Sequence, residues 1–188
     1  MKELETIETS RLLLVHLDES WMGRFAQNPK DAAKELEEFL SLEHSERTEH
    51  PPSAYQYANS EIARFPKSAE WLCFWEIVQK EQKCRIGGIL FKGPPDESGE
   101  TEIGYGVDKD FQRRGYGLEA VQAGIQWAFS KGAGAVIAKV NPGNKASRGL
   151  LEKVGMEQYC FIGKMPCYRI NRPLKAEQKG IKNGRCIL

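Results

Sequence analysis

The sequence predicts one α/β domain built around a mixed β-sheet. In the first half of the chain, short strand-forming runs are separated by polar turns, which is the pattern of antiparallel strands. In the second half, strands alternate with two amphipathic helices, as they do in β-α-β units. The chain has 188 residues, of which 40% are hydrophobic and 28% charged. These values fit one folded domain, which we expect over residues 1–174, followed by a basic, mobile tail over residues 175–188.

The N-terminal half is predicted to contain a strand, two helices and a strand pair. The apolar run 11–17 predicts the first strand. A helix over 28–40 begins with Asn-Pro, where Asn can cap free amides and Pro is tolerated in the first turn. A second helix is expected over 55–65. The almost continuous apolar run 71–78 predicts a strand covered on both faces, with 85–92 as its antiparallel partner.

The C-terminal half contains the β-α-β pattern. Apolar positions spaced three and four residues apart predict a helix over 117–129, and a second helix should begin at Asn144 and end at Gly155. Strands are expected over 100–107, 135–140, 156–163 and 165–170.

Composition excludes several classes of protein. Lys plus Arg number 27 and Asp plus Glu 26, so the chain lacks the basic excess typical of a nucleic-acid-binding protein. It has no apolar run long enough for a membrane span and no apolar segment at its start that would act as a secretory signal. The five cysteines include no Cys-x-x-Cys pair, so no zinc site or other metal site is expected. We therefore predict a cytoplasmic protein that binds neither nucleic acid nor membrane.

The most informative segment is Gln112-Arg-Arg-Gly-Tyr-Gly117, which directly precedes an amphipathic helix. Consecutive amides at a helix N-terminus bind anions, and the helix dipole adds to the attraction. Gly115 and Gly117 would let a phosphate approach the backbone, while Arg113 and Arg114 add positive charge. The alternative is a glycine-rich turn whose arginines are solvated.

Two other phosphate motifs do not fit this segment. Residues 115–120 match G-x-G-x-x-A, but a polar stretch separates them from the preceding strand and no acid lies about 20 residues further on. The sequence also has no Gly-Lys-Ser/Thr, which a P-loop requires.

Four segments between residues 102 and 156 resemble segments of the GCN5-related N-acetyltransferases, the GNAT family, and they follow one another along the chain as in that family. Residues 112–117 resemble the family signature Q/R-x-x-G-x-G/A, and the strand 102–107 stands where the family has a splayed strand. Residues 144–147 open the second β-α unit, and 150–156 are similar to the helix that ends in Lys-x-Gly-Phe. The opening, 9–14, resembles that of the branch with ribosomal-protein alanine N-acetyltransferases.

The resemblance implies a mostly antiparallel mixed sheet with splayed central strands flanked by helices. It implies that an acetyl group moves from acetyl-CoA to a primary amine, either a protein N-terminus or a small molecule, by direct attack. A catalytically silent acyl-CoA sensor and a nucleotide-binding module are the alternatives. Such enzymes commonly dimerise, which leaves a homodimer open.

The resemblance also implies the cofactor contacts. The pyrophosphate would lie on the amides that precede the helix, and the pantetheine arm would hydrogen-bond to the splayed strand like an added strand. The residues expected to bind acetyl-CoA are Tyr105, Gly106, Val107, Gln112, Arg113, Arg114, Gly115, Tyr116, Gly117, Leu118, Asn144 and Ser147.

Two residues are candidate catalytic groups. Glu102 is the candidate base, acting through water, although a solvated acid at a strand edge would explain it equally well. Many GNAT enzymes have a tyrosine as general acid in the last helix, where this chain has Leu151. Ser147 could take the role of that tyrosine as the general acid, but Ser147 could equally cap its own helix or hydrogen-bond to the cofactor. A backbone amide within 105–107 is the expected oxyanion donor.

Overall fold

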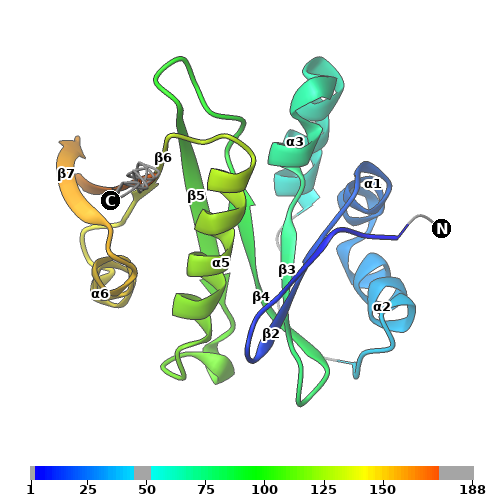
Figure 1. The fold of residues 1–188 in the computed structure, drawn as a ribbon. Helices are drawn as coiled ribbons and strands as arrows, with labels where there is room; N and C mark the ends of the chain where they lie inside the picture. The colour runs from blue at the N-terminus through cyan, green and yellow to red at the C-terminus, as the bar shows by residue number, and fades with distance from the viewer. Residues whose placement is uncertain (1–2, 45–51, 174–188) are drawn as a thin grey trace, which may run out of the picture.

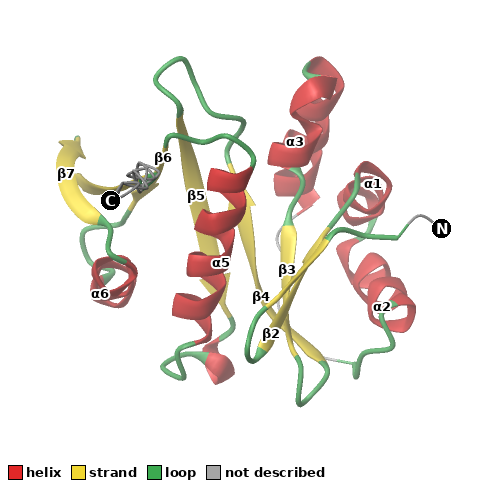
Figure 2. Cartoon of the chain, in the orientation of Figure 1, coloured by secondary structure: helices red, strands yellow, loops and turns green. Residues whose placement is uncertain are grey.

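An eight-stranded mixed sheet runs through the molecule (Figures 1 and 2). The computed structural model describes residues 3–44 and 52–173, so the predicted tail over 175–188 lies outside the described residues. The strands are β1 (Thr6–Glu8), β2 (Leu12–His16), β3 (Trp75–Gln79), β4 (Cys84–Phe91), β5 (Glu100–Val107), β6 (Ala135–Lys139), β7 (Glu157–Ile162) and β8 (Met165–Asn171). The helices are α1 (Glu19–Gln27), α2 (Pro29–Phe39), α3 (Pro52–Arg64), α4 (Ala69–Leu72), α5 (Tyr116–Ser130) and α6 (Lys145–Val154).

The strands lie in the order β1-β2-β3-β4-β5-β6-β8-β7. Neighbours from β1 to β5 are antiparallel, as are β6, β8 and β7. Only the central pair of the described sheet, β5 and β6, is parallel. The mixed, mostly antiparallel sheet that the sequence predicts is therefore confirmed.

Two hydrophobic clusters cover the two faces of the sheet. Ile103 of β5 packs in one of them with residues of α5 and with Leu151 of α6. The other contains Phe25 of α1 and Leu36 of α2, together with residues of α3. Figure 1 shows α5 lying across β5, with α1 and α2 at the side of β2. The sheet thus separates an α5–α6 face from an α1–α3 face.

Most predicted elements are confirmed, and local sequence explains their ends. The helix expected from residue 28 is α2, and the side chain of Asn28 accepts a hydrogen bond from the Asp31 amide. The strand expected over 100–107 is β5 with the same bounds. Gly155 ends α6 in the left-handed conformation, with a φ of 93°.

The strand predicted over 71–78 is wrong in its first half. Trp71 and Leu72 belong to the short helix α4, and β3 begins only at Trp75. A short, fully apolar run has no periodicity that separates a buried helical turn from a buried strand. Helix α1 and strand β1 were not predicted from the sequence.

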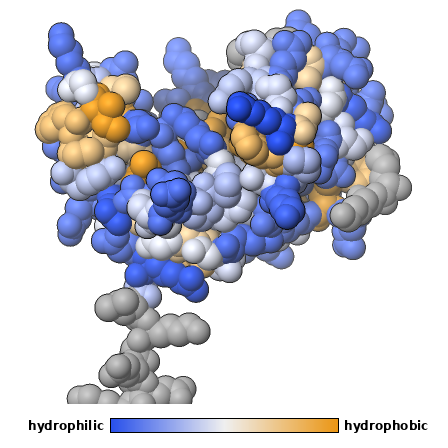
Figure 3. Space-filling model, turned by 90° about the horizontal axis from the view of Figure 1, so that it is seen from above, coloured by the Kyte–Doolittle hydropathy of each residue, from blue (hydrophilic) through white to orange (hydrophobic). Residues whose placement is uncertain are grey.

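The sheet ends at β7, whose side chains leave a large apolar surface exposed. Tyr159, Phe161 and Ile162 of β7 and Met165 of β8 are exposed, Phe161 by 62%. Apolar side chains gather on the β7 side of the molecule in the view from above (Figure 3). None of the helices in the described part combines the length and apolar character that a membrane span requires.

Candidate active site

The centre of the sheet opens where β5 and β6 part. Glu100, Thr101 and Glu102 pair with residues 135–137 of β6, and within the described chain the pairing stops there. The rest of β5, residues 103–107, stays paired with β4 on its other side. The backbone of 103–107 thus has an edge toward β6 that no strand occupies, as the expectation of a splayed strand requires.

The segment that follows β5 forms a cradle of backbone groups at the start of α5. Arg113 and Gly115 both have positive φ, 65° and 84°, so the chain turns sharply before the helix. Gly115 is the N-cap of α5 and offers no capping side chain. The first amides of the helix therefore stay available for an anion. The Gln112 side-chain amide donates to the Val107 carbonyl at 2.8 Å, which ties this cradle to the end of β5.

The cradle is also fixed from the N-terminal segment. Arg11 donates through Nε to Oε2 of Glu119 in the first turn of α5 at 2.8 Å, and its Nη1 donates to the Arg114 carbonyl at 2.9 Å. The Thr9 hydroxyl donates to the other carboxylate oxygen of Glu119 at 2.7 Å. Partial burial alone would raise the Glu119 pKa, but these hydrogen bonds outweigh it and hold the pKa below its ordinary value. Local sequence gives no sign of this anchor, because its partners are 103 to 110 residues apart.

Gly117 lies where α5, α6 and β5 meet. A Cβ atom there would lie 3.0 Å from Cδ1 of Leu150 and 3.5 Å from Cγ2 of Val107. Its lack of a side chain lets Leu150, in the middle of α6, pack close to the start of α5.

At the start of α6, the Asn144 side chain caps the helix by accepting from the Ser147 amide at 3.0 Å. The interpretation of Ser147 as the cap is therefore wrong, and its hydroxyl is used elsewhere. Ser147 Oγ lies 2.7 Å from the hydroxyl of Tyr105 on β5. The side chain of Tyr105 is thus a site residue that the sequence analysis considered only for its backbone. Leu151, one turn further along α6, is fully buried.

Glu102 stands at the point where β5 and β6 part. Its carboxylate forms ion pairs with Lys92, just after β4, and with Lys139 of β6, the latter at 2.7 Å. Burial alone would raise the Glu102 pKa, but the two lysines outweigh it and keep the pKa below its ordinary value. The side chain is only 11% exposed, so the alternative of a solvated strand-edge acid is wrong.

Glu102 and Tyr105 point to opposite faces of the sheet. Alternate residues of a strand face opposite sides, and Ile103, Tyr105 and Val107 all pack with the α5 cluster. Glu102 therefore faces the α1–α3 side. The cradle and Ser147 lie on the α5–α6 side.

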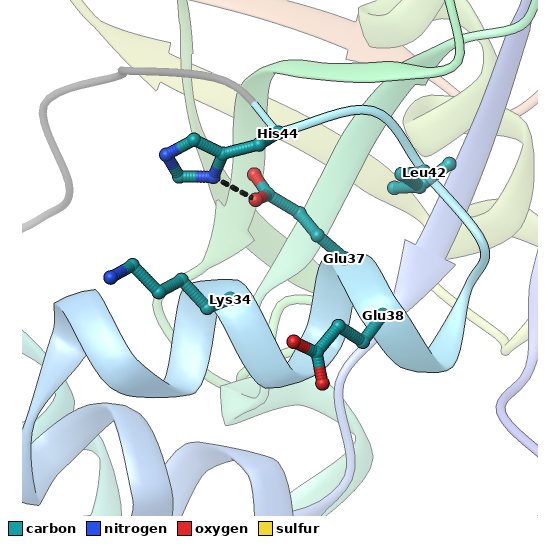
Figure 4. A pocket seen from close by; sticks show the side chains of 5 residues that line it. All are labelled: Lys34, Glu37, Glu38, Leu42 and His44. Atoms are coloured by element: carbon teal, nitrogen blue, oxygen red, sulfur yellow. Dashed lines mark hydrogen bonds and ion pairs between the residues drawn. The ribbon is translucent and has the colours of Figure 1, made fainter.

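A separate pocket lies beside α2, lined by Lys34, Glu37, Glu38, Leu42 and His44. In this pocket His44 Nδ1 lies 2.8 Å from the Glu37 carboxylate (Figure 4). It shares no residue with the cradle. In the part of the chain that the structure describes, no group of three or more His, Cys, Asp or Glu side chains is placed to hold a metal ion.

Comparison with known proteins identifies the family. The family model described as "Acetyltransferase (GNAT) domain" matches residues 11–157. The chain therefore belongs to the GNAT acetyltransferase family, a class whose fold binds acetyl-CoA. It is 32% identical over 153 residues to an uncharacterized N-acetyltransferase, YjdG, of Bacillus subtilis (strain 168), a match that covers 79% of this chain and 88% of the relative.

Solved structures share the fold at low identity. The ribosomal-protein-S5-alanine acetyltransferase from Vibrio fischeri superposes with a TM-score of 0.59 at 16% identity, over 89% of this chain and 96% of that one. RimL, a ribosomal L7/L12 alpha-N-protein acetyltransferase in complex with coenzyme A, gives a TM-score of 0.60 at 16% identity, over 89% and 98%. The predicted GNAT architecture is thus confirmed.

Proposed function

We propose that this protein is an N-acetyltransferase that moves the acetyl group of acetyl-CoA directly to a primary amine. The observation that carries the proposal is the opening between β5 and β6, with an anion cradle at the α5 N-terminus beside it. An extended arm with a phosphate-bearing end fits this combination, because the free strand edge and the cradle are joined by the Gln112–Val107 hydrogen bond.

The residues around the opening have separate roles in this proposal. The amides from Arg113 to Leu118 hold the pyrophosphate. The free edge of Tyr105 to Val107 hydrogen-bonds the pantetheine arm, and one of its amides stabilises the oxyanion as the amine attacks. Asn144 orders the start of α6 and so fixes Ser147 beside the sulfur.

The two candidate catalytic groups fit the two proton-related steps of the reaction, which are removal of the amine proton and stabilisation of the leaving thiolate. Glu102, on the α1–α3 face, is anionic at neutral pH because its pKa is lowered, so it can accept the amine proton through water. Ser147, on the α5–α6 face, can donate a hydrogen bond to the leaving thiolate. Substrate amine and donor sulfur would then approach the opening from opposite faces of the sheet.

We propose an α-amine of a protein N-terminus as the acceptor class, with small amines as the second choice. Of the proteins of similar fold named above, one is named as an acetyltransferase of an alanine in ribosomal protein S5, and RimL is named as an alpha-N-protein acetyltransferase of ribosomal L7/L12. The homodimer and the cytoplasmic location stay predictions.

The first experiment measures binding and turnover in parallel. Isothermal titration of the full chain with acetyl-CoA, CoA and ADP should give micromolar binding for the first two and far weaker binding for ADP. Mass spectrometry then follows acetylation of peptides beginning with Ala or Ser and of a short diamine, with Nα-blocked, lysine-free peptides as controls. Acetyl-CoA binding without transfer to any acceptor would favour the silent sensor, and no binding would refute the proposal.

The role of Glu102 is tested by Glu102→Gln, with Glu100→Gln as the matched control. Glu100 also pairs with a cation, Arg169 at 2.8 Å, and is similarly buried, but it lies further from the opening. Loss of a general base lowers kcat by about 100-fold or more, while loss of a structural ion pair does not. Equal kcat losses in both variants would remove Glu102 from the mechanism.

A further inference from the structure

The hydroxyl of Tyr105 meets Ser147 across the gap between β5 and α6. Its Oη lies 2.7 Å from Ser147 Oγ and 3.4 Å from the Ser147 carbonyl oxygen. The two residues are 42 positions apart, and no other hydrogen bond of the described residues joins β5 to α6 through side chains. Tyr105 is partly buried against the α5 cluster, so the phenol is held in place by packing.

We propose that Tyr105 is a positioning residue for the leaving thiolate, because it donates to Ser147 Oγ and thereby turns the Ser147 proton toward the sulfur. This inference rests on the proposed function. Ser147 alone could direct its hydroxyl proton to any nearby acceptor, including the carbonyl of its own turn. An incoming hydrogen bond from Tyr105 fixes the orientation of the serine lone pairs and leaves the proton free for the substrate.

Either hydroxyl can donate across the 2.7 Å contact, and we assign the donation to the phenol, whose O–H is the more acidic of the two. Burial raises the Tyr105 pKa more than the serine contact lowers it, so the phenol stays protonated and can donate. A phenol has one proton, and the contact at 2.7 Å is a better hydrogen bond than the one at 3.4 Å. Ser147 has one proton of its own, which then remains for a third partner. Leu151, in the same helix, has no proton that it could donate to the sulfur.

The proton balance needs no charge on Tyr105 or Ser147. The amine nitrogen forms a bond to the acetyl carbon, the carbon–sulfur bond breaks, and its electron pair goes to sulfur. An ordinary thiol has a pKa of about 8.5, so a thiolate can leave when a hydrogen bond stabilises it. Ser147 supplies that hydrogen bond, and the donation from Tyr105 strengthens it. The proton lost by the amine nitrogen passes through water, and one proton from water finally converts the thiolate to the thiol.

The test uses Tyr105→Phe, Ser147→Ala, the double variant and a matched control, Tyr168→Phe. Phenylalanine keeps the packing of Tyr105 and removes only the hydroxyl. Tyr168 also contacts α6 through its hydroxyl, at 3.3 Å from both Arg148 Nε and Glu152 Oε1, but it does not touch Ser147. Tyr168→Phe therefore measures how much kcat changes when α6 is loosened without any change at Ser147.

Tyr105→Phe should lower kcat about tenfold, the effect of one hydrogen bond on a transition state, and change the Kd of acetyl-CoA by less than about twofold. Ser147→Ala should lower kcat further, and the double variant should be no slower than Ser147→Ala, because Tyr105 acts only through the serine. Tyr168→Phe should keep kcat within about twofold of the wild type. A Tyr105→Phe variant with wild-type kcat, effects that multiply in the double variant, or equal losses in Tyr105→Phe and Tyr168→Phe would each overturn the inference.

A second measurement needs no acceptor. If Ser147 stabilises a bound thiolate, CoA should bind more tightly as pH rises from 7 toward 9, relative to a CoA analogue that lacks the sulfur. Tyr105→Phe should reduce this pH effect, and Tyr168→Phe should retain it. If the wild type shows this pH effect, Tyr105→Phe reduces it and Tyr168→Phe retains it, but no acetyl group is transferred, the proposed function is refuted and the role of the Tyr105 contact is supported. A flat pH profile would overturn the contact alone, and wild-type protein that binds no CoA would overturn both.

Discussion

Replacing Gly115 by alanine tests the cradle directly. Gly115 has a φ of 84°, a left-handed conformation that costs a residue with a side chain about 1–2 kcal/mol. The added Cβ would also lie 3.2 Å from Nη2 of Arg11, the group that anchors the cradle through Glu119 and Arg114. For a chain of this size, we expect a melting temperature lower by about 2–8 °C.

The same substitution should weaken acetyl-CoA binding. If the backbone leaves the left-handed region, the amides on either side of residue 115 rotate away from the pyrophosphate. Each lost hydrogen bond to a charged group is worth about 1.5–3 kcal/mol, which corresponds to about a 10- to 100-fold increase in Kd. Isothermal titration with acetyl-CoA measures this change, and calorimetry measures the melting temperature.

Gly132 provides the control at the opposite end of α5. Its φ is 103°, and a Cβ there would meet nothing within 4 Å. Gly132→Ala should therefore lower the melting temperature by a similar amount and leave acetyl-CoA binding unchanged. The reasoning is refuted if Gly115→Ala destabilises the protein but binds acetyl-CoA normally, or if Gly132→Ala weakens binding as much.

Three further results are expected. Gly149 lies in the middle of α6, where a Cβ would meet nothing within 4 Å. Gly149→Ala should raise the melting temperature by about 2–4 °C, because alanine is about 1 kcal/mol more favourable than glycine in a helix. A melting temperature below that of the wild type in calorimetry would contradict this. Arg11→Met should raise the Kd of acetyl-CoA about threefold or more by releasing Glu119 and the cradle. Arg24→Met, which breaks an exposed ion pair between α1 and α2, should not change the Kd in the same titration. Glu102→Gln should lower the free energy of unfolding by about 1–3 kcal/mol at pH 7, because two lysines lose their partner. The folded-state pKa of Glu102 lies below its unfolded value, so its ion pairs stabilise the protein fully above the ordinary carboxyl pKa and are lost as pH falls through the folded pKa. In urea titrations, the stability difference between the wild type and Glu102→Gln should therefore shrink as pH falls below the ordinary carboxyl pKa. A difference that grows on acidification would refute the ion-pair explanation.

Local sequence predicts what local chemistry controls. Asn28 and Asn144 cap helices because their side chains accept from amides three residues away, and Gly155 ends a helix because glycine adopts positive φ without strain. The cradle was recognisable for the same reason, since its glycines and the helix that follows are contiguous. The short helix α4 shows the limit, because an apolar run of a few residues has no period to interpret.

Long-range contacts decide how the site is completed. Tyr105 meets Ser147, Arg11 meets Glu119, and Glu102 meets Lys139, each from a different element of the fold. A residue's type shows that it can donate, accept or carry charge, but its partner depends on which strands become neighbours and which face each side chain takes. Sequence alone therefore determined the family, the main elements and the glycine-rich turn before α5. Only the tertiary structure decided that Glu102 is held by two lysines and that the phenol of Tyr105 reaches Ser147, because those contacts exist only once the sheet has formed and opened between β5 and β6.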